Sequence, residues 1–123
     1  MMERPIIKGL LFSMVIISSC YYDNEEELYP STSCITENMS LQTNIVPILQ
    51  NNCYSCHSIA TAPANRNVIL EGYDELIKYV NNGQLVGAIR HESDYPMPQN
   101  APKLSSCNIS KIESWIDAGA LDN

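Results

Sequence analysis

The chain has 123 residues and is acidic, with 7 lysine and arginine residues against 14 aspartate and glutamate residues and a formal net charge of −7 at pH 7. This balance argues against nucleic acid as a partner, because the phosphate backbone is bound by clustered basic side chains. The length leaves room for one small domain, whose own apolar burial would make it only marginally stable.

Residues 1–19 are predicted to be a lipoprotein-type signal peptide. Arg4 and Lys8 give a positive n-region, and the apolar run 10–17 is too short to span a bilayer as a mature helix. An isoleucine and two serines before Cys20 resemble a bacterial lipobox, in which the cysteine is acylated and becomes the mature N-terminus. The alternative is an ordinary cleavage site, but no A-x-A-type site is evident nearby. A lipid on Cys20 would tether the protein to a membrane surface.

Residues 20–33 are predicted to be an acidic, flexible tether, because they show no helical or strand period and end in turn-forming residues. Removal of residues 1–19 leaves 5 basic against 13 acidic residues, a formal charge of about −8. Acidic residues shortly after a lipoprotein cysteine also resemble the signal that some bacterial lineages use for export to the cell surface. We therefore expect a lipid-anchored protein of the bacterial cell envelope, periplasmic or on the cell surface.

Residues 34–123 are globular in character, and a first helix is predicted over residues 41–50. Apolar residues recur there with the spacing of one helical face, and Ser40 is placed as an N-cap. Pro47 indicates that this helix is kinked or begins near that position, since proline fits a first turn and not a helix interior.

Two further helical regions follow, and no strand is predicted. Residues 73–80 have an amphipathic pattern that ends at Asn81-Asn82-Gly83, and residues 85–90 can add one or two turns. The clearest helix is predicted within residues 104–120. It has serines as caps, a stripe formed by Ile109, Ile112 and Ile116 with Trp115 beside it, and a terminating Gly119, and we expect it to pack against the first helix.

Cys53, Cys56 and His57 form the C-x-x-C-H pattern by which bacteria attach c-type haem covalently. Each thiol adds to one haem vinyl group, and the histidine reaches the iron as proximal ligand. A zinc site would be hard to complete, because there is no second C-x-x-C and only one other histidine, His91. A thioredoxin-like redox motif would require a βαβ pattern that the sequence lacks. The motif therefore favours one covalently bound haem c.

Met97 is the candidate distal ligand. The prolines on both sides hold it in an extended loop, so its thioether is displayed rather than packed in a helix. A methionine that fills a core gap is the ordinary alternative, but Met39 is the only other methionine after the predicted cleavage site and precedes the haem motif. His91 is a rival ligand for a bis-histidine site. Otherwise it would face the solvent or the haem propionates.

These features resemble the small c-type cytochromes, specifically the cytochrome c-like domains of bacterial lipoproteins and envelope enzymes. The resemblance covers roughly residues 34–122 and depends on the C-x-x-C-H motif, the Met97-Pro98 loop and a terminal helix that carries Ile112, Trp115, Ile116, Gly119 and Ala120. It implies an all-α, cytochrome c-like fold with three to five short helices around one haem. Cys53 and Cys56 would be the thioether links, His57 the proximal ligand and Met97 the distal one. The glycine and aromatic residue of the mitochondrial N-terminal helix are missing here.

Cys34 and Cys107 remain as an even pair in a chain expected to be secreted. They flank the two terminal helices that should meet, so we expect a disulfide between them, with two free thiols as the alternative.

The expected function follows from the ligands of the iron. Histidine and methionine on both axial positions leave no open site, so the domain would carry single electrons rather than act as an enzyme. Its redox partner in the envelope would present a basic face to the acidic surface. The alternatives are a peroxidase or ligand sensor with an open distal site, or a haem-bearing accessory subunit of an envelope complex. The peroxidase alternative is weakened because His91 and Glu92 are the only candidates for a distal acid and base.

Overall fold

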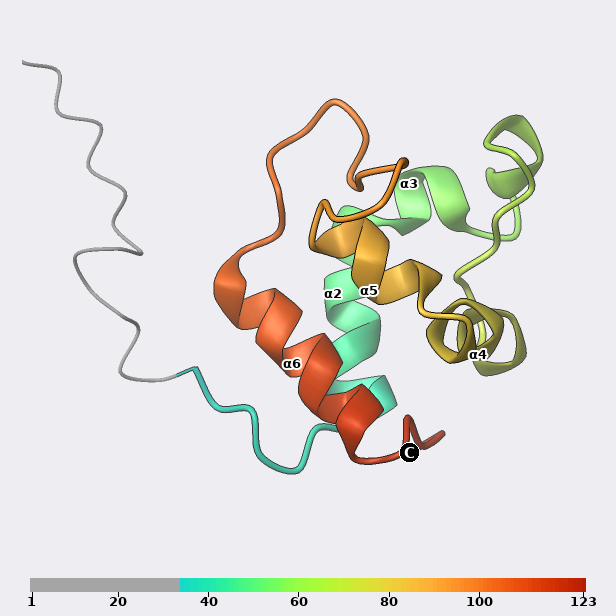
Figure 1. Cartoon of the computed structure of the whole chain (residues 1–123). Coiled ribbons are helices and arrows are strands. Elements are labelled where there is room, and N and C mark those ends of the chain that lie inside the picture. Colours follow the sequence, from blue (N-terminus) through green and yellow to red (C-terminus); the bar gives the residue numbers. More distant parts are fainter. Residues whose placement is uncertain (1–33) are drawn as a thin grey trace, which may run out of the picture. The chain divides into compact units, whose positions relative to one another are not determined.

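The computed structural model describes residues 34–123, so the predicted signal peptide, the tether and Cys20 lie outside the described residues. This part of the chain is all-α and contains no strand, which confirms the predicted fold class at that level (Figure 1). Its elements are short: η1 (Leu41–Ile45), α2 (Val46–Asn52), α3 (Tyr54–His57), η2 (Ala62–Ala64), α4 (Tyr73–Asn81), α5 (Gln84–Ile89) and α6 (Ser106–Asp117). Within residues 34–123, no helix has the length and apolarity needed to cross a membrane.

The predicted first helix is present and is divided near Pro47. The Ser40 side chain caps it by accepting a hydrogen bond from the Thr43 N–H at 3.4 Å. The first turn, η1, is a π-helix, and the regular α-helix begins at Val46 with Pro47 in its first turn. Proline is tolerated there because an N–H in the first turn has no partner within the helix.

The next two helices also follow the prediction. In α4, Leu76 and Val80 are buried, and the helix ends at the turn that precedes Gly83. Gly83 has a φ of 76°, in the left-handed region that glycine adopts readily, and it starts α5. The glycine therefore lets α5 begin almost immediately after α4.

The last helix, α6, is capped by Ser105, whose hydroxyl accepts a hydrogen bond from the Asn108 N–H at 3.2 Å. Its buried stripe differs from the expected one in one position. Trp115 is buried with Ile109 and Ile112, whereas Ile116 is half-buried. Trp115 is the largest fully buried side chain of the described residues. Its indole Nε1–H donates to the Leu121 carbonyl at 2.9 Å.

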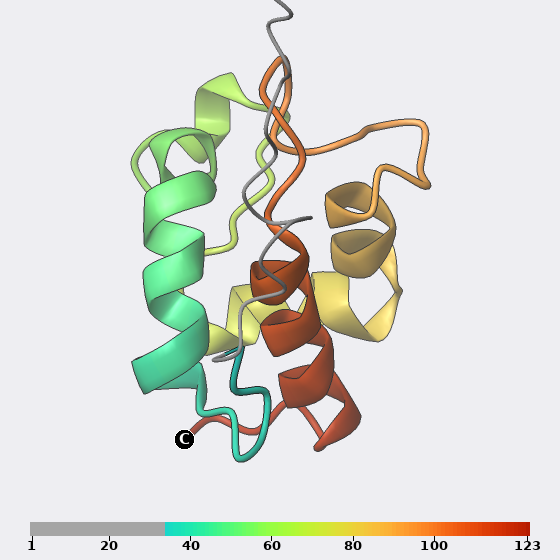
Figure 2. The ribbon, with the colours of Figure 1, turned by 90° about the vertical axis from the view of Figure 1, so that its left-hand side faces the viewer.

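The hydrophobic core lies between these helices. As predicted, α6 packs against the first helix through η1, and in Figure 2 α6 stands between the η1–α2 rod and α5. Every buried side chain among the described residues is hydrophobic. The most deeply buried large side chains are Leu41, Ile45, Leu49, Leu76, Ile89, Ile112 and Trp115.

The predicted disulfide between Cys34 and Cys107 is present, with an S–S distance of 2.04 Å and a Cα–Cα distance of 5.7 Å. It joins the start of the described chain to the first turn of α6. The bond thus holds the segment before the first helix against the last helix.

Candidate functional site

The C-x-x-C-H motif forms a single helical turn directly after α2. Cys53 separates α2 from α3, and its carbonyl accepts hydrogen bonds from the N–H groups of Cys56 (3.1 Å) and His57 (2.9 Å). Cys53 is half-buried and packs against the hydrophobic core, whereas Cys56 is exposed. Both thiols are free, so the structure brings two unpaired thiols and one imidazole together on one turn.

Burial raises the pKa of the Cys53 thiol from 9.0 to about 11, because the surrounding core disfavours the thiolate. The pKa of the neighbouring Tyr54 is also raised, mainly by burial and then by the charges of Glu71 and Cys53. A redox-active C-x-x-C motif needs a cysteine with a lowered pKa. Because burial raises the pKa of Cys53, this cysteine does not meet that requirement.

The imidazole of His57 is oriented by the backbone of the following loop. Its Nδ1 lies 2.9 Å from the carbonyl oxygen of Val68. A carbonyl can only accept a hydrogen bond, so Nδ1 carries the proton and Nε2 keeps a free lone pair in the neutral ring. The Leu70 N–H donates to the His57 carbonyl at 2.9 Å, which ties the same loop to the same residue a second time. Histidines that bind metals are usually held in this way.

Met97 lies in the segment between α5 and α6, and two contacts hold its backbone. Its N–H donates to the Ala88 carbonyl at 3.0 Å, and its carbonyl accepts a hydrogen bond from His91 Nε2, also at 3.0 Å. The Met97 side chain is half-buried, whereas His91 is exposed. In both ribbon views this segment and α3 lie at the same end of the fold (Figures 1 and 2).

His91 has a role that the sequence did not predict. The sequence makes His91 a rival iron ligand, and in the structure its Nε2 bonds to the backbone carbonyl of Met97. Residue type alone does not reveal such a contact, because the acceptor is a carbonyl that every residue has. The same holds for Val68, which orients His57.

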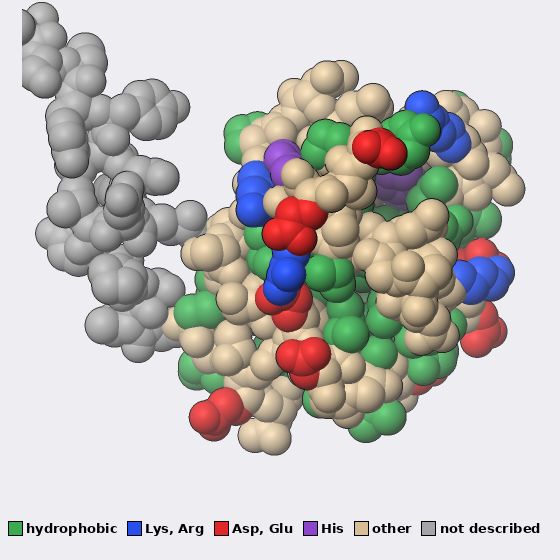
Figure 3. Space-filling view, viewed as in Figure 1, with side chains coloured by type: hydrophobic (Ala, Val, Ile, Leu, Met, Phe, Trp, Pro, Cys, Tyr) green, Lys and Arg blue, Asp and Glu red, His purple; other side chains and the backbone are tan. Residues whose placement is uncertain are grey.

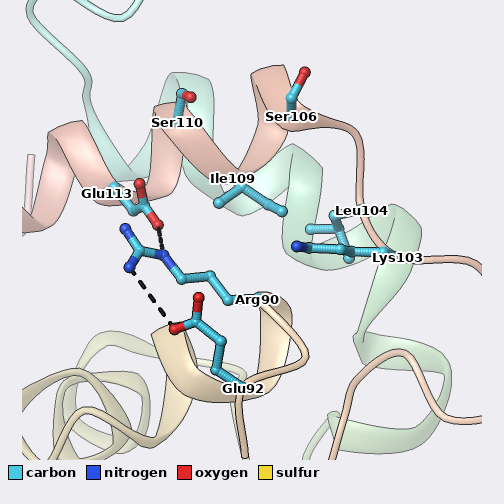
Figure 4. Close-up of a pocket in the computed structure, with 8 residues that line it drawn as sticks. All are labelled: Arg90, Glu92, Lys103, Leu104, Ser106, Ile109, Ser110 and Glu113. Carbon is cyan, nitrogen blue, oxygen red and sulfur yellow. Dashed lines mark hydrogen bonds and ion pairs between the residues drawn. The ribbon is translucent and has the colours of Figure 1, made fainter.

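Two hollows lie on the surface of the described residues, and neither is lined by the motif cysteines, His57 or Met97. In the first, Arg90 pairs with Glu113 and, at 3.9 Å, with Glu92, and Lys103 also lines the hollow, so two positive and two negative side chains balance there (Figure 4). The second lies between the first helix and α4 and includes Leu41, Gln42, Val46, Gln50, Tyr54, Glu71, Gly72, Tyr73 and Leu76. The candidate site is therefore defined by the contacts of the C-x-x-C-H turn and not by these hollows.

Residues 34–123 contain no group of three or more histidine, cysteine, aspartate or glutamate side chains placed to hold a metal ion. An iron atom bound by one histidine and one methionine within a haem needs no such group.

Comparison with known proteins gives no match: no family model, no curated protein and no solved structure matches the chain.

Proposed function

We propose that the protein is a membrane-tethered c-type cytochrome that carries single electrons in the bacterial cell envelope. The observation that carries the proposal is the 2.9 Å contact between His57 Nδ1 and the Val68 carbonyl. It leaves Nε2 available as proximal ligand directly after two free thiols. Cys53 and Cys56 would form the thioether links, and Met97 would be the distal ligand.

The described residues fit a c-type haem. Two free thiols share one helical turn with the oriented imidazole, and the thioether-bearing segment lies at the same end of the fold. Cys53 packs against the hydrophobic core, which would give the apolar macrocycle an apolar neighbour. The short helices at this end would surround the haem in a cytochrome c-like arrangement. When bound, the haem would supply the one-electron chemistry, and the chain would bind it, orient it and exclude water from it.

Electron transfer is the activity that this ligand set supports best. Histidine and methionine together leave no position on the iron for oxygen or peroxide and raise the reduction potential. Acidic side chains are spread over the face seen in Figure 3, with basic side chains between them. With the formal charge of −7 for the whole chain, this surface would favour a redox partner with a basic face. A lipid on Cys20 would keep the protein at the membrane.

The first test is the absorption spectrum of the oxidised and reduced protein, produced with c-type maturation machinery. We expect a six-coordinate, low-spin c haem with a thioether-to-iron charge-transfer band. Met97→Leu should lose this band, and Met39→Leu, the matched control in the core, should retain it. A high-spin wild-type protein that binds carbon monoxide readily would overturn the proposal and favour a peroxidase or a ligand sensor.

Two chemical tests address the covalent attachments. Cys53→Ala combined with Cys56→Ala should release all haem on acid extraction, whereas the wild-type protein should retain it. Haem that stays with the double variant would contradict thioether attachment. Palmitate labelling should be lost in Cys20→Ala, and labelling that persists would contradict the lipid anchor.

A further inference from the structure

A cation–π contact joins two loops that are distant in the sequence. The guanidinium carbon of Arg66 lies 4.4 Å from the centroid of the Tyr95 ring. This is within the distance at which a ring attracts a cation through its quadrupole. Arg66 belongs to the loop after the C-x-x-C-H turn, and Tyr95 belongs to the segment that contains Met97.

Each partner is two residues from a group of the candidate site. Arg66 precedes Val68, whose carbonyl orients His57, and Tyr95 precedes Met97. The contact thus links the loop that holds the proximal ligand to the loop that supplies the distal one.

The backbone at Arg66 is in an unusual conformation. Arg66 and the next residue, Asn67, have φ values of 59° and 55°, in the left-handed region that residues with a Cβ rarely adopt. The loop is kept in this form by hydrogen bonds from the N–H groups of Asn65 (2.7 Å) and Asn67 (2.9 Å) to the Ala62 carbonyl. These bonds place an exposed, flexible arginine where its head group meets the tyrosine.

The hydrogen bonds near Met97 come from α5, from the residues just after it, or from within the segment itself. Met97 is bonded to Ala88 in α5 and to His91 just after it, and the Tyr95 N–H donates to the Ser93 hydroxyl at 3.3 Å. These bonds hold the segment to α5 but do not hold it toward α3. The Arg66–Tyr95 contact instead joins the segment to the loop that follows α3.

We propose that Arg66 and Tyr95 are positioning residues that close the Met97 segment toward the His57 side of the site. The pair would thereby determine how often the thioether leaves the iron and opens the distal position to a small ligand. This inference rests on the proposed haem function, because it assigns the contact a role at the iron.

The test uses the haem-loaded protein with Arg66→Ala, Tyr95→Ala and the double variant. Two rates depend on how often the Met97 thioether leaves the iron: carbon monoxide binding to the reduced protein and imidazole binding to the oxidised protein. Each single variant should raise both rates roughly two- to fivefold, the effect of an exposed cation–π pair. The double variant should raise them no further, because one contact is lost in all three.

Conservative and control variants separate positioning from general destabilisation. Tyr95→Phe keeps the ring and should behave as the wild-type protein. Lys78→Ala removes the exposed ion pair with Glu75 in α4 and should leave both rates unchanged. The exchange rate of the Ile112 amide in the core should remain the same in every variant, since a loop contact does not affect global unfolding.

The outcomes distinguish this inference from the proposed function. A wild-type protein without the thioether-to-iron band would overturn the function, and the role of the pair at the iron would fall with it. A wild-type protein with the band, but with unchanged rates in both single variants, would overturn the positioning role alone. Additive effects in the double variant would also overturn it.

Discussion

The imidazole Nδ1 of His57 lies 2.9 Å from the carbonyl oxygen of Val68, eleven residues further along the chain. This bond fixes the tautomer of the ring and its rotation about the side chain. The returning bond from the Leu70 N–H to the His57 carbonyl holds the same loop against the C-x-x-C-H turn. The proposed ligand for iron is thus oriented by backbone groups, whose positions depend on the path of the loop and not on its side chains.

The two histidines of the chain provide a matched pair of variants. His57→Ala should abolish the low-spin haem spectrum, because it removes the proposed proximal ligand while the proposed thioether links at Cys53 and Cys56 remain. His91→Ala should keep a low-spin spectrum, because this variant loses only the bond to the Met97 carbonyl. Visible absorption and electron paramagnetic resonance of the two variants measure the difference. Loss of the low-spin state in His91→Ala with retention in His57→Ala would reverse the assignment.

The disulfide should contribute strongly to stability. Cys34 and Cys107 are separated by 73 positions, and a cross-link across a loop of that length is worth about 4 kcal/mol in the chain-entropy model. Cys34→Ser together with Cys107→Ser should lower the free energy of unfolding by about that amount. Urea denaturation of the haem-loaded protein measures it. An unchanged denaturation midpoint would contradict the prediction.

The helices could largely be predicted from the sequence, because their signals are local. The Ser40 cap, the division near Pro47 and the turn at Gly83 each depend on the chemistry of one residue type. The sequence does not predict the burial of Trp115 in place of Ile116, because the two residues are consecutive in the helix and either could face the core. The shape of the surrounding core decides between them, and periodicity does not report that shape.

The candidate site could be predicted only in part. The C-x-x-C-H motif identifies its own residues, since the chemistry requires a fixed spacing. The carbonyls of Val68 and Met97 carry no signal in the sequence, yet they bond to the two histidines. The contact between Arg66 and Tyr95 depends on two left-handed backbone positions in a loop without periodicity. Such contacts follow from tertiary structure and not from composition.

Substitution by alanine should have opposite effects on the free energy of unfolding at Gly83 and at Gly87. Gly83→Ala should lower the free energy of unfolding by about 1 kcal/mol, because its φ of 76° is unfavourable for alanine. Nothing lies within 4 Å of the added methyl group, so this cost comes from the backbone alone. Gly87→Ala lies inside α5, where the methyl group would meet Ser93 at an ordinary 3.6 Å, and should stabilise by up to about 1 kcal/mol. Thermal unfolding distinguishes them, and equal effects would contradict the prediction.

The buried thiol of Cys53 predicts a pH dependence that haem attachment should remove. In the haem-free protein its pKa is about 11, compared with 9.0 when unfolded, so above pH 9 the unfolded state loses its proton first. The free energy of unfolding should therefore fall between pH 9 and 11, by about 1–2 kcal/mol for a half-buried thiol.

Two comparisons test this assignment to Cys53. Cys53→Ser should lack the fall in unfolding free energy that Cys53 causes, while it retains the contribution of Tyr54. The haem-loaded protein should also lack it, because a thioether has no proton to lose. Urea unfolding at several pH values measures all three, and equal slopes for wild type and Cys53→Ser would contradict the assignment.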